Sequence, residues 1–316
     1  KASFQGLDPG EYEFLFMASN NDGVWSERSD GIKIAVRPPA WKTWWAYSSY
    51  IGIIAITALG AVKRRDKNQL EKLEETRRTE ELEEARSFQL KMLPKECPKI
   101  LDLDITATIE TATEVGGDYY DFFPQKNKES IYVVVGDATG HGMTAGMMVS
   151  ITKAGLYGTQ PDMPPNEISY GLNRVIKAFS LGKTKMAISI ARFWEDRVEF
   201  TSAAMPPVYH YHGDTGETDE ILLEGLPLGS IKGETYSQVE IKLKKKDTFV
   251  FISDGLPEAT NKNEQMLGYK AVLNCVRENG NKSAEEIKQI LIDLGKAWLG
   301  ELRNQDDITI VVVKKN

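Results

Sequence analysis

Four aspartates of this chain lie where apolar runs begin or end: Asp118, Asp137, Asp254 and Asp306. Asp137 and Asp254 each follow a run rich in Val, Ile and Phe, Asp118 follows a glycine pair, and Asp306 precedes another apolar run. Short apolar runs of this composition are typical of buried strands. The sequence therefore predicts four carboxylates at strand ends, an arrangement that is costly unless a cation gathers them.

The chemistry that fits these residues is that of hard divalent cations. Mg²⁺ and Mn²⁺ prefer carboxylate, carbonyl and water oxygens as ligands, and two such ions about 3.5–4 Å apart can orient a water and clamp a phosphoryl group. A single Asp-Gly pair is more often a turn. The two cysteines, Cys97 and Cys275, form no CxxC pair, and the three histidines are too few for a histidine-based metal cage together with a catalytic base.

Six ordered blocks of the sequence resemble the metal-dependent serine/threonine phosphatases of the protein phosphatase 2C superfamily, in the bacterial sporulation-protein-E/RsbU branch. The blocks are residues 114–122, 136–142, 201–207, 225–229, 253–261 and 306–309. The resemblance covers about residues 90–316. It implies an α+β domain, a four-layer α/β/β/α sandwich with the metals at one end of the sheets.

The resemblance also implies roles for single residues. Asp118 and Asp137 would bind two Mn²⁺ or Mg²⁺ ions, with Asp137 bridging them, and the backbone carbonyl of Ala138 would be a further ligand. Asp254 and Asp306 would complete the shell of one ion. The implied reaction is hydrolysis of a phosphomonoester by a metal-bound water, without a phosphoenzyme.

Other residues near these blocks keep alternative interpretations. Asp121 and Asp307 are candidates for supporting the ligands from behind, although Asp121 could simply cap a turn. His141 could protonate the leaving oxygen, but a histidine that shapes the glycine-rich turn is the favoured interpretation. Ala204 and Met205 replace a glycine and a histidine found in many relatives, so no role of that histidine can be transferred.

Hydrophobic patterning predicts the elements that position these residues. Strands are expected near 101–110, 131–136, 186–194, 197–203, 207–212, 238–243, 248–253 and 308–313. Helices are expected near 142–157, 165–180, 266–279 and 283–300. By the resemblance, 142–180 is a candidate regulatory element.

Four segments are predicted along the chain. Residues 1–40 resemble the end of a triple-tyrosine, fibronectin-III-like sensor module, a β-sandwich fragment that begins inside a longer protein. Residues 41–62 include 20 consecutive uncharged positions, 43–62, with aromatic residues at the start and a basic triplet directly after them, which predicts a transmembrane helix. Residues 63–93 form a mixed-charge helix with a broken heptad seam, either a dimerising coiled coil or a solvated helix. Residues 94–316 form the phosphatase domain.

Together these features predict a single-pass protein of the bacterial cytoplasmic membrane, with residues 1–40 outside the cytoplasm and 63–316 inside. The expected substrate is a phosphorylated partner protein of the anti-sigma-factor-antagonist type, and the net charge of −7 argues against a nucleic-acid surface. Three alternatives stay open: a non-catalytic module that keeps the fold for binding, a receptor histidine kinase, and a soluble protein in which 43–62 is a buried helix.

Overall fold

The computed structural model describes residues 4–26, 31–112, 115–125, 129–140, 142–160, 162–179 and 181–316. The chain divides into two compact units, Lys1–Thr76 and Arg77–Asn316.

The N-terminal unit contains one antiparallel strand pair and the start of a long helix. Strand β1 (Gly10–Phe14) pairs with β2 (Ile32–Val36), and a short 3-10 helix, η1 (Ala40–Lys42), follows. Helix α1 (Trp44–Met92) runs without a break through the predicted span and the predicted helical linker. Its residues after position 62 are mostly strong helix formers, so nothing local ends the helix there. By length and composition, α1 is the one helix among the described residues that could cross a membrane.

The C-terminal unit is built on two five-stranded antiparallel sheets. The first has the order β10 (Gln238–Lys242), β7 (Arg197–Ala203), β6 (Met186–Phe193), β5 (Ile131–Ala138), β4 (Asp118–Pro124). The second has the order β3 (Leu103–Glu110), β12 (Ile308–Lys315), β11 (Thr248–Ile252), β8 (Val208–Tyr211), β9 (Thr218–Ile221). The predicted strands do not include β4 or β9.

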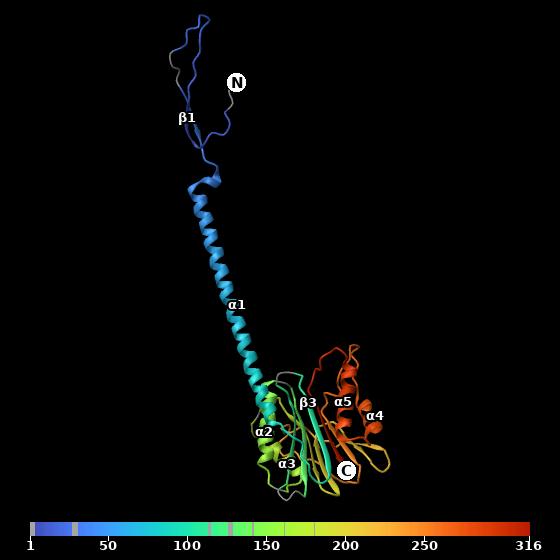
Figure 1. Ribbon diagram of the computed structural model, residues 1–316. Helices are drawn as coiled ribbons and strands as arrows, with labels where there is room; N and C mark the ends of the chain where they lie inside the picture. The colour runs from blue at the N-terminus through green and yellow to red at the C-terminus, as the bar shows by residue number, and fades with distance from the viewer. Residues whose placement is uncertain are drawn as a thin grey trace. The chain divides into compact units, whose positions relative to one another are not determined.

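Helices cover the outer face of each sheet (Figure 1). Helices α2 (Met143–Tyr157) and α3 (Pro165–Phe179), drawn in green, pack on the first sheet. Helices α4 (Tyr269–Asn279) and α5 (Ala284–Leu299), drawn in orange and red, pack on the second. The structure therefore confirms the predicted four-layer α/β/β/α sandwich.

The central strands of both sheets are buried on both faces, and their successive side chains enter two different cores. In β5, Val133 and Val135 lie in the core between the sheets, whereas Val134 lies in the core under α2 and α3. In β12, Val311 lies between the sheets and Val312 lies under α4 and α5. Successive side chains of a strand point to opposite faces, so a strand covered on both faces is apolar throughout.

Candidate metal centre

The two sheets bring the four predicted aspartates to one end of the sandwich. Asp118 opens β4 and lies directly opposite Asp137 near the end of β5. Asp254 follows β11 by two residues and Asp306 precedes β12 by two residues. Because β11 and β12 are antiparallel, with Ile252 opposite Ile310, the end of one lies beside the start of the other.

The carboxylates are close enough to raise one another's pKa. Burial, followed by the charge of Asp137, raises the pKa of Asp118 well above its usual range. Burial, followed by the charges of Asp254 and Asp306, raises the pKa of Asp137 to about 7. Burial and the charge of Asp306 also raise the pKa of Asp254 to about 6. Without a cation this end of the sandwich therefore concentrates unfavourable negative charge.

Among the described residues, one oxygen in the cluster has no partner with hydrogen-bond geometry. Oδ2 of Asp118 is buried and unpaired, although buried polar atoms are nearly always paired. The hydroxyls of Thr309 and Ser253 act to lower the pKa of Asp118, but burial and the charge of Asp137 outweigh them. A divalent cation shared with Asp137 would satisfy this oxygen, so the residues fit such an ion.

Gly117 lets the backbone of β5 come close to Asp118. A Cβ atom at this position would lie 2.5 Å from the carbonyl oxygen of Ala138 and 3.1 Å from Oδ1 of Asp137. Such contacts are too short for any residue other than glycine. The amide N–H of Ala138 also donates to the carbonyl of Gly117 at 3.0 Å. Gly117 therefore keeps the Ala138 carbonyl beside the carboxylates.

Asp307 holds the chain that leads to Asp118. Its side chain is buried, and its Oδ2 accepts from the N–H of Gly117 at 2.7 Å and of Asp118 at 3.4 Å. Its Oδ1 accepts from the N–H of Ala112 at 2.7 Å. These bonds tie Asp307 to the backbone on the way to Asp118, so its side chain is suited to positioning Asp118.

Asp121 lies on the other face of β4 from Asp118. It is buried, accepts a hydrogen bond from the Tyr119 hydroxyl at 2.7 Å and forms an ion pair with Lys153 of α2. Its contacts join the sheet to α2 and do not reach the four clustered aspartates. His141, for which a catalytic role and a role in shaping the turn are both open, lies outside the described residues.

Two residues contribute to the centre although the sequence alone predicts no such role for them. Gln89, in the last turn of α1, is buried and bonds twice to Gly116: its Nε2 donates to the carbonyl at 2.8 Å, and its Oε1 accepts from the N–H at 3.1 Å. Glu258 adds negative charge that raises the pKa of both Asp137 and Asp254. Gln89 lies in the predicted linker helix 63–93, whose broken heptad pattern predicts helix contacts and gives no sign of a bond to the site.

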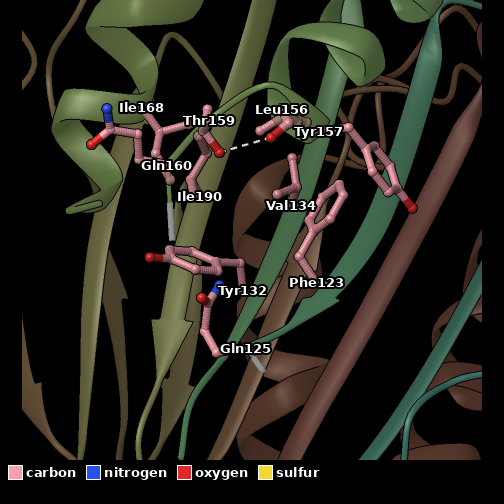
Figure 2. Close-up of a pocket in the computed structure, with 10 residues that line it drawn as sticks. All are labelled: Phe123, Gln125, Tyr132, Val134, Leu156, Tyr157, Thr159, Gln160, Ile168 and Ile190. Atoms are coloured by element: carbon pink, nitrogen blue, oxygen red, sulfur yellow. Dashed lines mark hydrogen bonds between the residues drawn. The ribbon is translucent and has the colours of Figure 1, made fainter. Parts of the chain in front are cut away.

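A separate pocket of about 280 Å³ lies between the outer face of β4–β6 and the end of α2 (Figure 2). The ring of Phe123 meets that of Tyr157 edge to face at 4.8 Å, and Tyr132 donates its hydroxyl hydrogen to the Met163 carbonyl. None of the ten residues that line the pocket is an acid, a histidine or a cysteine. The pocket therefore lacks the groups that phosphoryl chemistry would need.

Comparison with known proteins identifies the family of this chain. The family model of stage II sporulation protein E (SpoIIE) matches residues 127–316, which is 190 of 316 residues. The chain therefore belongs to the SpoIIE family, and the family predicted from the six sequence blocks is confirmed. The match includes Asp137, Asp254 and Asp306 but begins after Asp118.

Individual relatives give the same result. The phosphoserine phosphatase RsbU of Bacillus subtilis (strain 168) is 29% identical over 235 residues, covering 73% of this chain and 69% of RsbU. The SiaA-PP2C domain of Pseudomonas aeruginosa has a TM-score of 0.68 at 20% identity, covering 77% of this chain and 98% of that domain. RsbX, solved in complex with magnesium, has a TM-score of 0.55 at 17% identity, covering 70% and 99%. These names agree with the predicted enzyme class, a protein phosphatase.

Proposed function

We propose that this chain is a metal-dependent phosphatase that hydrolyses phosphoserine or phosphothreonine on a partner protein. Asp118, Asp137, Asp254 and Asp306 would hold two Mn²⁺ or Mg²⁺ ions, and the Ala138 carbonyl would be a further ligand. The observation that carries the proposal is the buried, unpartnered Oδ2 of Asp118 among carboxylates whose pKa values are raised. The similarity to RsbU and to magnesium-bound RsbX supports the choice of reaction and ion.

The chain's own residues have three tasks in this proposal. When bound, a pair of divalent cations supplies an activated water and the positive charge that a phosphoryl group needs. The carboxylates of Asp118 and Asp137 would hold the cations together at one site, and Gly117 leaves room for the Ala138 carbonyl. Asp307 and Gln89 hold the backbone before Asp118 at fixed distances, which matters because misplacement of about 1 Å can cost roughly 100-fold in rate.

The substrate and the setting are extensions of this proposal. Because RsbU is named a phosphoserine phosphatase, we expect this chain to act on phosphoserine. The family resemblance adds the expectation that the substrate is a partner protein of the anti-sigma-factor-antagonist type. The first part of α1 carries exposed apolar side chains such as Ile53, Ile56 and Leu59, which suits a lipid environment. We therefore assign residues 41–62 to a single span of the bacterial cytoplasmic membrane, 1–40 to an external sensor segment and 94–316 to a cytoplasmic phosphatase domain. Residues 63–93 would be a dimerising linker.

The test is release of inorganic phosphate from a phosphoserine protein by the full chain in detergent micelles. Activity should require Mn²⁺ or Mg²⁺, cease with EDTA, and be lost in Asp137→Asn. The matched control is Asp196→Asn, which neutralises an exposed aspartate in the β6–β7 turn and should keep full activity. Turnover that survives both EDTA and Asp137→Asn would refute the proposal. Metal binding without turnover on any phosphoprotein would favour the non-catalytic binding module.

A further inference from the structure

Two histidines and an aspartate come together at the opposite end of the second sheet. His210 lies in β8, His212 just after it, and Asp247 just before β11. One potential ligand atom from each of the three side chains lies within 4.8 Å of the other two. No local sequence pattern connects the three residues, because Asp247 is 35 residues beyond His212.

This cluster is remote from the candidate metal centre. Asp247 precedes β11 and Asp254 follows it, so the two are seven positions apart. At about 3.3 Å per residue in a strand, that separation is roughly 23 Å. The two groups of ligands therefore cannot share an ion.

A buried ring nitrogen of His210 faces Asp247. The side chain is only 2% exposed, and its Nε2 lies 3.2 Å from Oδ2 of Asp247, close enough for His210 to lower the pKa of that carboxyl. Among the described residues, however, this nitrogen has no partner with hydrogen-bond geometry. The ring is fixed by stacking on Phe249, at 4.1 Å and an interplanar angle of 13°. A buried, oriented imidazole nitrogen without an aligned hydrogen bond is unusual, because such an atom loses its bond to water without full replacement.

The distance between these two atoms suits a shared cation. Ligands about 2.0–2.1 Å from a tetrahedral ion lie roughly 3.3 Å from one another. Asp247 is ready to serve as a ligand, since the N–H groups of Gly213 and Lys244 each donate to it at 2.9 Å. Each carboxylate oxygen accepts more than one bond, so these donors orient the group and leave a lone pair free.

His212 has the supporting partner that a metal-binding histidine usually has. Its Nε2 lies 2.8 Å from Oδ2 of Asp219 in β9. When Nε2 carries the proton and donates to Asp219, Nδ1 keeps its lone pair. A carboxylate in this position fixes the tautomer and orientation of a histidine ligand. His212 is partly exposed, so water has access to complete the coordination.

We propose that His210, His212 and Asp247 form a second metal site, which takes a first-row transition ion such as Zn²⁺. Two imidazoles and one carboxylate suit Zn²⁺, Co²⁺, Ni²⁺ and Cu²⁺, whereas the oxygen ligands of the phosphatase centre suit Mg²⁺ and Mn²⁺. The two sites would therefore select different ions from one solution. An ion here would fasten the β8–β9 hairpin to the start of β11.

Co²⁺ is the probe that distinguishes the two sites. Four-coordinate Co²⁺ with nitrogen ligands absorbs visible light far more strongly than six-coordinate Co²⁺ with oxygen ligands. The full chain in detergent micelles is titrated with Co²⁺ in excess Mg²⁺, which occupies the oxygen-rich centre. We expect strong visible bands that saturate at one Co²⁺ per chain and that Zn²⁺ abolishes.

Variants identify the ligands. His212→Gln should remove the strong bands, and Asp219→Asn should weaken Co²⁺ binding by about 10- to 100-fold. Asp214→Asn is the matched control, since it neutralises an exposed aspartate of the same hairpin whose partner is Lys244. Circular dichroism and thermal unfolding without metal check that each variant folds. Wild-type chain without strong bands, or bands that persist in His212→Gln, would overturn the proposal.

Discussion

Asp137→Asn should make the metal-free protein more stable while it abolishes metal binding. Burial and neighbouring carboxylates raise the pKa of Asp137 from 3.8 to about 7. A shift of about 3 units corresponds to roughly 4 kcal/mol of folding free energy that the ionised group costs at pH 7.5. We expect the amide to recover about 2–4 kcal/mol, because the neighbouring carboxylates also lose a repulsive charge. In the 240 residues of Arg77–Asn316 this corresponds to roughly 4–16 °C in Tm.

The dependence on pH gives the sign of the effect. The folded-state pKa of Asp137 lies above its unfolded value, so ionisation of Asp137 destabilises the folded wild type. This cost is absent below about pH 4 and grows as pH rises to about 7. The advantage of Asp137→Asn should therefore fall to less than about 2 kcal/mol at pH 5.

Thermal unfolding of Arg77–Asn316 in EDTA, at pH 5 and 7.5, measures the difference. Asp196→Asn should change the free energy of unfolding by no more than about 0.5 kcal/mol. Mn²⁺ at about 100 times its Kd should add roughly 2.7 kcal/mol to the wild type and little to Asp137→Asn. A variant that is less stable than wild type in EDTA at pH 7.5, or one that Mn²⁺ still stabilises fully, would refute the electrostatic reasoning.

Three further changes test the same centre. Gln89→Ala should lower turnover at least tenfold and destabilise the unit Arg77–Asn316 by about 2 kcal/mol, because the N–H and carbonyl of Gly116 lose their partners. Phosphate release and thermal unfolding measure the two effects. The control in both assays is Gln289→Ala, which changes an exposed glutamine. Gly117→Ala should abolish metal-dependent turnover, whereas Gly171→Ala, a helix position with open space for a Cβ, should keep activity and gain up to about 1 kcal/mol in unfolding. The apparent Mn²⁺ affinity, measured by calorimetry, should fall as pH decreases from 8 to 6. The reason is that protons compete with the ion for Asp137 and for Asp254, whose pKa is about 6. An affinity that does not change with pH would contradict the raised pKa values.

Patterning predicted most of the sandwich because its strands are covered on both faces. The strands β5 and β12 can be predicted from their own sequence, because burial of both faces makes nearly every position in their central runs apolar. The ends of those runs carry Asp137 and Asp306, so the placement of the carboxylates followed from the placement of the strands. The left-handed backbone at Ala204, φ 61°, also matches the expected glycine of that block, and Met205 fills the core between the sheets.

The strands that patterning missed are those whose polar residues find partners far along the chain. Strand β4 carries Asp118 toward the metal centre and Asp121 toward Lys153, which is 32 residues away, and two acids in seven residues do not suggest a buried strand. Strand β9 is a four-residue edge strand with Asp219 and Glu220. Charged residues on a short edge strand are common in natural sheets, but their local pattern resembles a loop.

The same long-range contacts connect the end of α1 to the chemistry. The pair Gly116-Gly117 is held from two directions, by Gln89 of α1 and by Asp307 just before β12, and the next residue is Asp118. Any movement that withdraws Gln89 leaves the N–H and carbonyl of Gly116 unpaired, at a cost of about 1–3 kcal/mol for each buried group. The position of Asp118 and the packing of the last turn of α1 therefore depend on one another. A signal that shifts this turn would change the position of a proposed ligand through only two hydrogen bonds.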